Sequence, residues 1–184
     1  LPLGLDHTYF DSSGVLIPER VNGYRKDGLI FRNADYWSPT IAYAAGGLLS
    51  NTEDLFQWFQ GLLNGKILKK ETLEKAFTPF KLKDGSLIRD CEGWYIEDLG
   101  SIKSIEQGGN MNGFTTNEIY YPQEDIFITV LFNCEDAEKD KISNNISEIV
   151  LGKSLQTDTF LKEGILNTYI GTYALTTDRK RTIT

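Results

Sequence analysis

The pattern of apolar and polar residues changes its period twice along the chain, and each change separates predicted elements. Residues 1–45 show weak periodicity and many turn formers, which predicts an irregular segment dominated by loops. The next stretch is predicted to be helical. Its apolar residues recur at the offsets of one helix face: Leu55, Trp58, Phe59, Leu62 and Leu63. We therefore expect one face of this helix to lie in the core.

Both ends of this helix carry boundary signals. Ser50 and Glu53 have the spacing of a capping box, in which each side chain accepts a hydrogen bond from the backbone amide of the other residue. Asn64 and Gly65 supply the stop. A shorter helix is expected over about 70–77, ended by a proline.

The period then changes to that of strands. Four strand-like runs follow the turn at 83–85, and they span 92–97, 101–107, 114–121 and 126–133. The loop between the last two runs is short enough to force an antiparallel hairpin. The sequence therefore predicts an α+β fold, with an antiparallel sheet of about four strands and helices before and after it.

A helical period returns after Asp136 and ends near Gly152. We expect its apolar stripe to cover one face of the sheet; the stripe consists of Ile142, Ile146, Ile149 and Val150. The alternating run at 166–173 is interpreted as the first strand of a truncated further module. The predicted organisation is one domain portion at 1–155 (mostly loop and helices at 1–80, sheet plus terminal helix at 81–155), then a linker and the start of that module at 156–184.

Composition narrows the partners. The 184 residues carry a net charge of -7, which disfavours nucleic acid because phosphate binding needs clustered Lys and Arg. No apolar run reaches the roughly 18 residues of a membrane span, and the N-terminus lacks the layout of a signal peptide. Cys91 and Cys134 match no metal-ligand spacing, and His7 is the only histidine. No metal and no cofactor are expected. The cysteines are small buried thiols or, in an exported protein, a disulfide.

Candidate chemistry gathers in one glycine-rich stretch, where a strand is predicted to run into a turn. Its residues are Gln107, Gly108, Gly109 and Asn110. Glycine lets a ligand approach the backbone closely, so the stretch is a candidate binding edge. An ordinary tight turn explains the same residues. Asn110 and Asn112 either contact a ligand or tolerate a left-handed backbone.

Several short motifs, each weak alone, follow one another in a recognisable order. They are Leu3-Gly4-Leu5, Thr8-Tyr9-Phe10, Ala44 to Ser50, Gly93-Trp94, Gln107-Gly108-Gly109, Gly113-Phe114 and Val130 to Asn133. In this order they resemble the C-terminal part of the serine beta-lactamase and penicillin-binding-protein superfamily, over about residues 1–150. The most similar branch contains class C beta-lactamases, D-alanyl-D-alanine carboxypeptidases and esterases.

The resemblance implies part of a beta-lactamase/transpeptidase-like fold and a role for the glycine-rich stretch. Gln107-Gly108-Gly109 stands where the family has Lys-Thr-Gly or His-x-Gly, on a strand that lines the substrate groove. The backbone N–H of Asn110 would be one of two oxyanion donors. Gln107 departs from the pattern, because glutamine cannot balance a substrate's charge or relay a proton at neutral pH.

The sequence contains no Ser-x-x-Lys and no Tyr-x-Asn, the motifs that hold the family's nucleophile and its partners. We therefore expect a fragment of a serine hydrolase that acts on beta-lactams, D-amino acid peptides or esters, and expect it to be inactive alone. The alternatives are a non-catalytic domain that binds peptide or cell-wall-like ligands, and a purely structural domain. Family membership implies a bacterial, periplasmic or secreted setting. An unpaired edge at 126–133 is expected to promote self-association or strand exchange.

Overall fold

The computed structural model describes residues 3–12, 14–99, 102–152, 171–176 and 179–183. The chain separates into two compact units, Leu1–Gly152 and Lys153–Thr184. In the second unit, β12 (Gly171–Thr176) and β13 (Arg179–Ile183) pair antiparallel. The predicted strand at 166–173 lies outside the described residues over 166–170, and its last three positions belong to β12.

The first unit is built on an antiparallel sheet of five strands, in the order β11-β10-β9-β8-β7. The strands are β7 (Asp90–Cys91), β8 (Trp94–Leu99), β9 (Ile102–Met111), β10 (Phe114–Tyr121) and β11 (Ile126–Phe132). The predicted α+β fold with an antiparallel sheet is confirmed. The additional strand is the short β7, which reverses into β8 through Glu92 and Gly93, both at positive φ.

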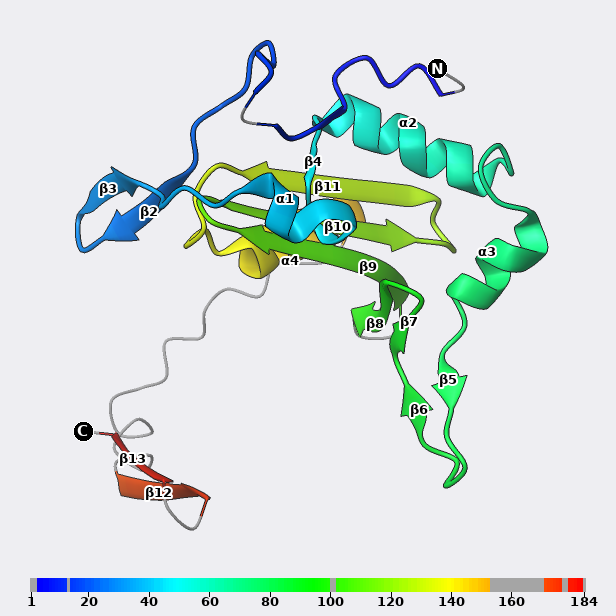
Figure 1. The fold of residues 1–184 in the computed structure, drawn as a ribbon. Coiled ribbons are helices and arrows are strands. Elements are labelled where there is room, and N and C mark those ends of the chain that lie inside the picture. The colour runs from blue at the N-terminus through cyan, green and yellow to red at the C-terminus, as the bar shows by residue number, and fades with distance from the viewer. Residues whose placement is uncertain (1–2, 13, 100–101, 153–170, 177–178, 184) are drawn as a thin grey trace. The chain divides into compact units, whose positions relative to one another are not determined.

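Two helices pack on opposite sides of this sheet, α2 (Thr52–Leu63) and α4 (Lys139–Val150) (Figure 1). Successive residues of a strand point to opposite faces. Tyr120 of β10 accordingly joins the cluster around Phe59 of α2, whereas its neighbour Ile119 joins the cluster that includes Ile146 of α4. The sheet therefore has two packed faces, named here the α2 face and the α4 face.

Helix α2 forms where the apolar period predicts it, but the predicted capping box is wrong. The N-cap is Asn51, whose Oδ1 accepts a hydrogen bond from the amide of Asp54 at 2.8 Å. The hydroxyl of Ser50 is instead 2.9 Å from that of Thr8, in the N-terminal segment. The predicted stop is confirmed, because Gly65 follows the helix at φ +70. Phe59 is completely buried, so the predicted core face is also confirmed.

Helix α4 forms where predicted, but of its predicted stripe only Ile146 packs against the sheet. Ser143 and Ser147 are completely buried there, whereas the exposed fractions of Ile142 and Ile149 are 38% and 61%. The reason is polar: Asn117 of β10 points at α4, and its Nδ2 donates to Ser143 Oγ at 2.9 Å. A buried amide needs such a partner, so a serine stripe suits this face better than isoleucine.

The N-terminal segment contains more regular structure than the predicted loops. Its elements are β1 (Tyr9–Phe10), β2 (Tyr24–Asp27), β3 (Ile30–Asn33), α1 (Pro39–Ala42), the 3-10 helix η1 (Tyr43–Ala45) and β4 (Leu48–Leu49). Strand β1 pairs with β4, and β2 pairs with β3 as a hairpin. In the sequence, α2 is followed by α3 (Lys70–Ala76), as predicted, and then by the small hairpin of β5 (Phe80–Lys81) and β6 (Leu87–Ile88).

The structure also bears on three further expectations, which concern the cysteines, the edge of the sheet and membrane spans. Both cysteines are free thiols, not a disulfide, and Cys91 is buried as expected whereas Cys134 is only half-buried. Strand β11 is at the edge of the sheet and pairs only with β10 among the described strands, which confirms the unpaired edge. Over the described residues, none of the helices has the length and apolarity needed to cross a bilayer.

Candidate functional site

The four residues of the glycine-rich stretch all lie within β9, which continues to Met111. The reversal comes later, at Asn112 and Gly113, and only Gly113 has positive φ (+83). The tight-turn interpretation of 107–109 is therefore wrong, and a left-handed backbone does not explain Asn110 or Asn112. Glycines in sequence suggested a turn, but their pairing with β10 holds them in an extended strand.

Strand β9 is longer than its neighbour β8, which leaves one of its edges open. Pairing with β8 covers Ile102 to Glu106 and stops there. On the other side, pairing with β10 continues to Met111. Over 107–111, β9 therefore has no strand beside it on the β8 side among the described residues; this stretch is named here the open edge. Gln107, Gly108 and Asn110 are exposed on it.

The register of the hairpin decides which backbone groups face the open edge. Met111 and Phe114 flank the two-residue turn as partners. Such a closing pair normally exchanges both backbone hydrogen bonds, and hydrogen-bonded and non-hydrogen-bonded pairs then alternate along the ladder. Asn110 and Gly108 consequently direct their N–H and C=O groups away from β10. Unpaired backbone donors at a strand edge are able to bind an extended ligand or an acyl oxygen.

The side chains of the stretch divide between the two faces of the sheet. Gln107 is directly opposite Glu118 of β10, which is opposite Thr129 of β11, so these three side chains share the α2 face. Asn110 points to the α4 face, where its Oδ1 accepts a hydrogen bond from Thr115 Oγ1 at 2.6 Å. Glu106 lies on that face too, away from Gln107, as strand alternation predicted.

Glu118 is a titratable group that the sequence analysis missed. Burial raises the pKa of its carboxyl from 4.5 to about 7, because loss of hydration disfavours the charged form. Beside it, the buried hydroxyl of Thr129 has no hydrogen-bond partner among the described residues. The only sign of Glu118 in the sequence is that an acidic residue occurs inside a predicted strand. On the α4 face, burial also raises the pKa of Glu106, whereas the hydrogen bond from Ser104 lowers it.

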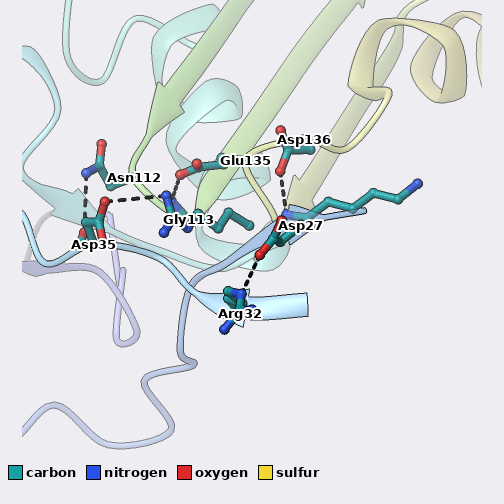
Figure 2. Close-up of polar contacts among 9 residues, drawn as sticks. Asp27, Arg32, Asp35, Asn112, Gly113, Glu135 and Asp136 are labelled. Atoms are coloured by element: carbon teal, nitrogen blue, oxygen red, sulfur yellow. Dashed lines mark hydrogen bonds and ion pairs between the residues drawn. The ribbon is translucent and has the colours of Figure 1, made fainter. Parts of the chain in front are cut away.

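The β2–β3 hairpin holds the turn that ends the open edge (Figure 2). The amide of Tyr24 donates to the carbonyls of Gly113 and Asn133, at 3.3 and 3.0 Å. Asn112 Nδ2 donates to the carbonyl of Asp35 at 3.3 Å, and Glu135 accepts from the amide of Gly113 at 2.6 Å. Asn112 therefore has a structural role here.

Glycine is needed at this contact for reasons of space. A Cβ on Gly113 would lie 2.6 Å from the Cα of Gly23 and 2.8 Å from the Cβ of Ala34. The two glycines thus bring two backbones into direct contact.

No metal site is suggested, since no group of three or more candidate ligands exists within the described ranges.

Comparison with known proteins places these features in a family. The Beta-lactamase family matches residues 1–152. The chain is 23% identical over 152 residues to "Putative penicillin-binding protein PbpX" of Bacillus subtilis (strain 168), covering 81% of this chain and 36% of that protein.

Solved structures show the same fold. The octameric penicillin-binding protein homologue from Pyrococcus abyssi matches with a TM-score of 0.68 and 24% identity, over 93% of this chain and 40% of its own. The D-stereospecific amidohydrolase from Streptomyces sp. matches with a TM-score of 0.66 and 21% identity, over 83% and 46%. The D-amino acid amidase from Ochrobactrum anthropi SV3 matches with a TM-score of 0.60 and 17% identity, over 72% and 40%.

The chain spans less than half the length of these relatives: 36% of PbpX and 40% of the Pyrococcus homologue. The family match, in contrast, covers the whole of the first unit, including the sheet and both packing helices. The chain therefore belongs to the Beta-lactamase family.

Proposed function

We propose that the protein carrying this chain is a serine hydrolase that transfers acyl groups from beta-lactams, D-amino acid peptides or amides, or esters. This chain would supply the strand-edge wall of the active site. The observation that carries the proposal is the open edge of β9, where Gly108 and Asn110 are exposed and direct their backbone groups outward. Preorganised N–H donors of this kind stabilise the oxyanion of an acyl-transfer transition state by several kcal/mol.

The nucleophile would come from sequence outside the 184 residues, which contain no Ser-x-x-Lys and no Tyr-x-Asn. Acyl transfer to a serine needs a hydroxyl with an adjacent base. The D-amino acid amidase and the D-stereospecific amidohydrolase among the structural neighbours support D-amino acid derivatives as one substrate class. By resemblance, we also infer a periplasmic or secreted setting.

The test compares the complete open reading frame with the 184-residue chain. We expect the complete protein to hydrolyse at least one of three substrates, a chromogenic beta-lactam, a nitrophenyl ester or D-phenylalanine amide. We expect the chain alone to stay at background with all three. Turnover with burst kinetics by the chain alone would contradict the division of the site.

The alternative is a non-catalytic domain that keeps the groove for peptide or cell-wall-like ligands. Gln107 is the observation that favours it, because the family has a cation or an imidazole there and glutamine has neither property. The two functions are separated by the upstream sequence and by the assay: a complete protein without Ser-x-x-Lys that binds a D-amino acid peptide without turnover is the binding domain.

We also propose that the protein self-associates. The unpaired edge of β11 supports this, as does the octameric state of the homologue from Pyrococcus abyssi. Analytical ultracentrifugation of the complete protein tests the proposal, and a monomer at all concentrations would refute it.

A further inference from the structure

A row of three polar side chains crosses the α2 face of the sheet, starting at the open edge. Gln107 of β9, Glu118 of β10 and Thr129 of β11 are directly opposite one another in the ladder. Gln107 is exposed, whereas Glu118 and Thr129 are half-buried. The row therefore connects the open edge with the more buried part of the α2 face.

The ladder brings the side chains of Gln107 and Glu118 within reach of each other. Counting from the closing pair of the hairpin, Met111 and Phe114, the pair of Gln107 and Glu118 is again a hydrogen-bonded one. The Cβ atoms of directly opposite residues are about 5 Å apart. Both side chains are long and end in a planar polar group, so rotations about side-chain bonds are enough to join the amide and the carboxyl.

Two groups of this row are poorly satisfied. Burial raises the pKa of the Glu118 carboxyl to about 7, and no hydrogen bond from a described residue offsets this effect. The buried hydroxyl of Thr129 has no partner within the described ranges. Buried polar groups normally have one. The amide of Gln107 is therefore placed beside a carboxyl that lacks a hydrogen bond.

The other titratable groups on the neighbouring elements do not account for the state of Glu118. They are Lys103 on β9, Tyr120 on β10, Glu53 and Asp54 on α2, and Tyr43 on η1, and β11 has none. The hydroxyl of Tyr120 donates to Asp125 at 3.3 Å. The carboxylate of Asp54 accepts hydrogen bonds from the N-terminal segment. Burial alone thus makes the Glu118 carboxyl hold its proton up to neutral pH.

We propose that Glu118 is a positioning residue that sets which end of the Gln107 amide faces the open edge. A protonated carboxyl donates a hydrogen bond to Gln107 Oε1, so that the Gln107 NH₂ group points outward as a donor. An ionised carboxyl only accepts, so it binds the NH₂ group and turns Oε1 outward. The carbonyls of a bound peptide, amide or ester are acceptors, and only the first arrangement offers them a donor.

This inference rests on the proposed function and deepens it, because Glu118 would supply the titratable group that glutamine itself lacks. The outward donor is present while Glu118 is protonated, below about pH 7, and is lost as pH rises through this value. Glu118→Gln keeps an NH₂ donor toward Gln107 Oε1 at every pH, so it reproduces the protonated state.

The first test follows the side-chain amide of Gln107 by NMR in the complete protein without ligand, between pH 5 and pH 9. We expect its resonances to shift with a midpoint near pH 7, and to stay constant in Glu118→Gln. Glu124→Gln, at an exposed loop position, is the matched control and should keep the wild-type midpoint. Constant Gln107 resonances in the wild type, or a midpoint that survives Glu118→Gln, would refute the positioning role.

The second test measures kcat/KM against pH with the nitrophenyl ester of N-acetyl-D-phenylalanine, which has no ionisable group in this range. Wild type and Glu118→Gln should agree within about twofold at pH 5.5. At pH 9 the wild type should be about fivefold lower, the value of one neutral hydrogen bond. In a Gln107→Leu background, Glu118→Gln should change neither value. An equal effect with and without Gln107 would show that Glu118 does not act through it.

The two tests separate this inference from the proposed function. A Gln107 titration that depends on Glu118, in a complete protein that hydrolyses none of the substrates, refutes the proposed function alone. Hydrolysis by a protein whose Gln107 amide does not respond to Glu118 refutes the positioning role alone.

Discussion

Glu118→Gln is expected to change how stability depends on pH. The carboxyl of Glu118 has a pKa of about 7 in the folded chain, against 4.5 for an ordinary glutamate. A raised carboxyl pKa means that the folded state holds a proton which the unfolded state has already released. Below about pH 4.5 both states are protonated and nothing is lost; as pH rises from there through 7, the folded state loses stability.

The size of this loss follows from the shift. About 2.5 pKa units at 1.36 kcal/mol each correspond to about 3 kcal/mol once Glu118 is fully ionised. Glutamine has nearly the same shape and stays neutral, so it reproduces the protonated form. We therefore expect the variant and the wild type to be equally stable at pH 4.5, and the variant to be more stable by about 3 kcal/mol at pH 8.5.

Urea unfolding of both proteins between pH 4.5 and pH 8.5 measures this difference. The half-buried Glu106 contributes in the same direction to both proteins, so its contribution cancels in the comparison. Glu124→Gln, at an exposed position in the β10–β11 loop, serves as the control and should leave the difference from wild type near zero. Stability curves for wild type and Glu118→Gln that run parallel across this range would refute the reasoning.

Three further outcomes test other parts of the structure. Gly113→Ala should lower stability by about 2 kcal/mol or more, because φ is +83 and the new Cβ would meet backbone at 2.6 Å; thermal unfolding measures it, and a loss below 1 kcal/mol counts against the contact. Asn51→Ala should lower the free energy of unfolding in urea by about 1 kcal/mol, and Glu53→Ala by much less. A larger loss for Glu53→Ala than for Asn51→Ala would support the capping box instead. The isolated chain should scatter light as an assembly that weakens on dilution or when the exposed Leu131 of β11 is changed to Lys, and a monomer that resists dilution contradicts the free edge.

The apolar period was sufficient to predict the long elements of the first unit, but not its short strands and hairpins. Helix α2 and the long strands β10 and β11 lie where the period predicts them, because each has one strongly apolar face and a clear stop. The period failed for α4, where Ile149 is exposed and Ser147 is buried. What decides that face is the amide of Asn117 on another element, and no pattern within the helix itself records it.

The candidate site was predictable in composition and not in arrangement. The residues of the open edge were found, but their glycines indicated a turn, and only the ladder with β10 shows that they form a strand. Glu118 was missed because its relation to that stretch depends on a contact across strands. Single charged residues in sequence give no sign of such neighbours.

The meeting of Gly23 and Gly113 joins main chain to main chain, so nothing there can yield by rotating about a side-chain bond. An insertion or a bulkier residue near position 23 would consequently move the turn after Met111, and this movement would shift the last exposed amides of β9. A change in the β2–β3 hairpin would thus alter the geometry of the open edge without altering any residue on it.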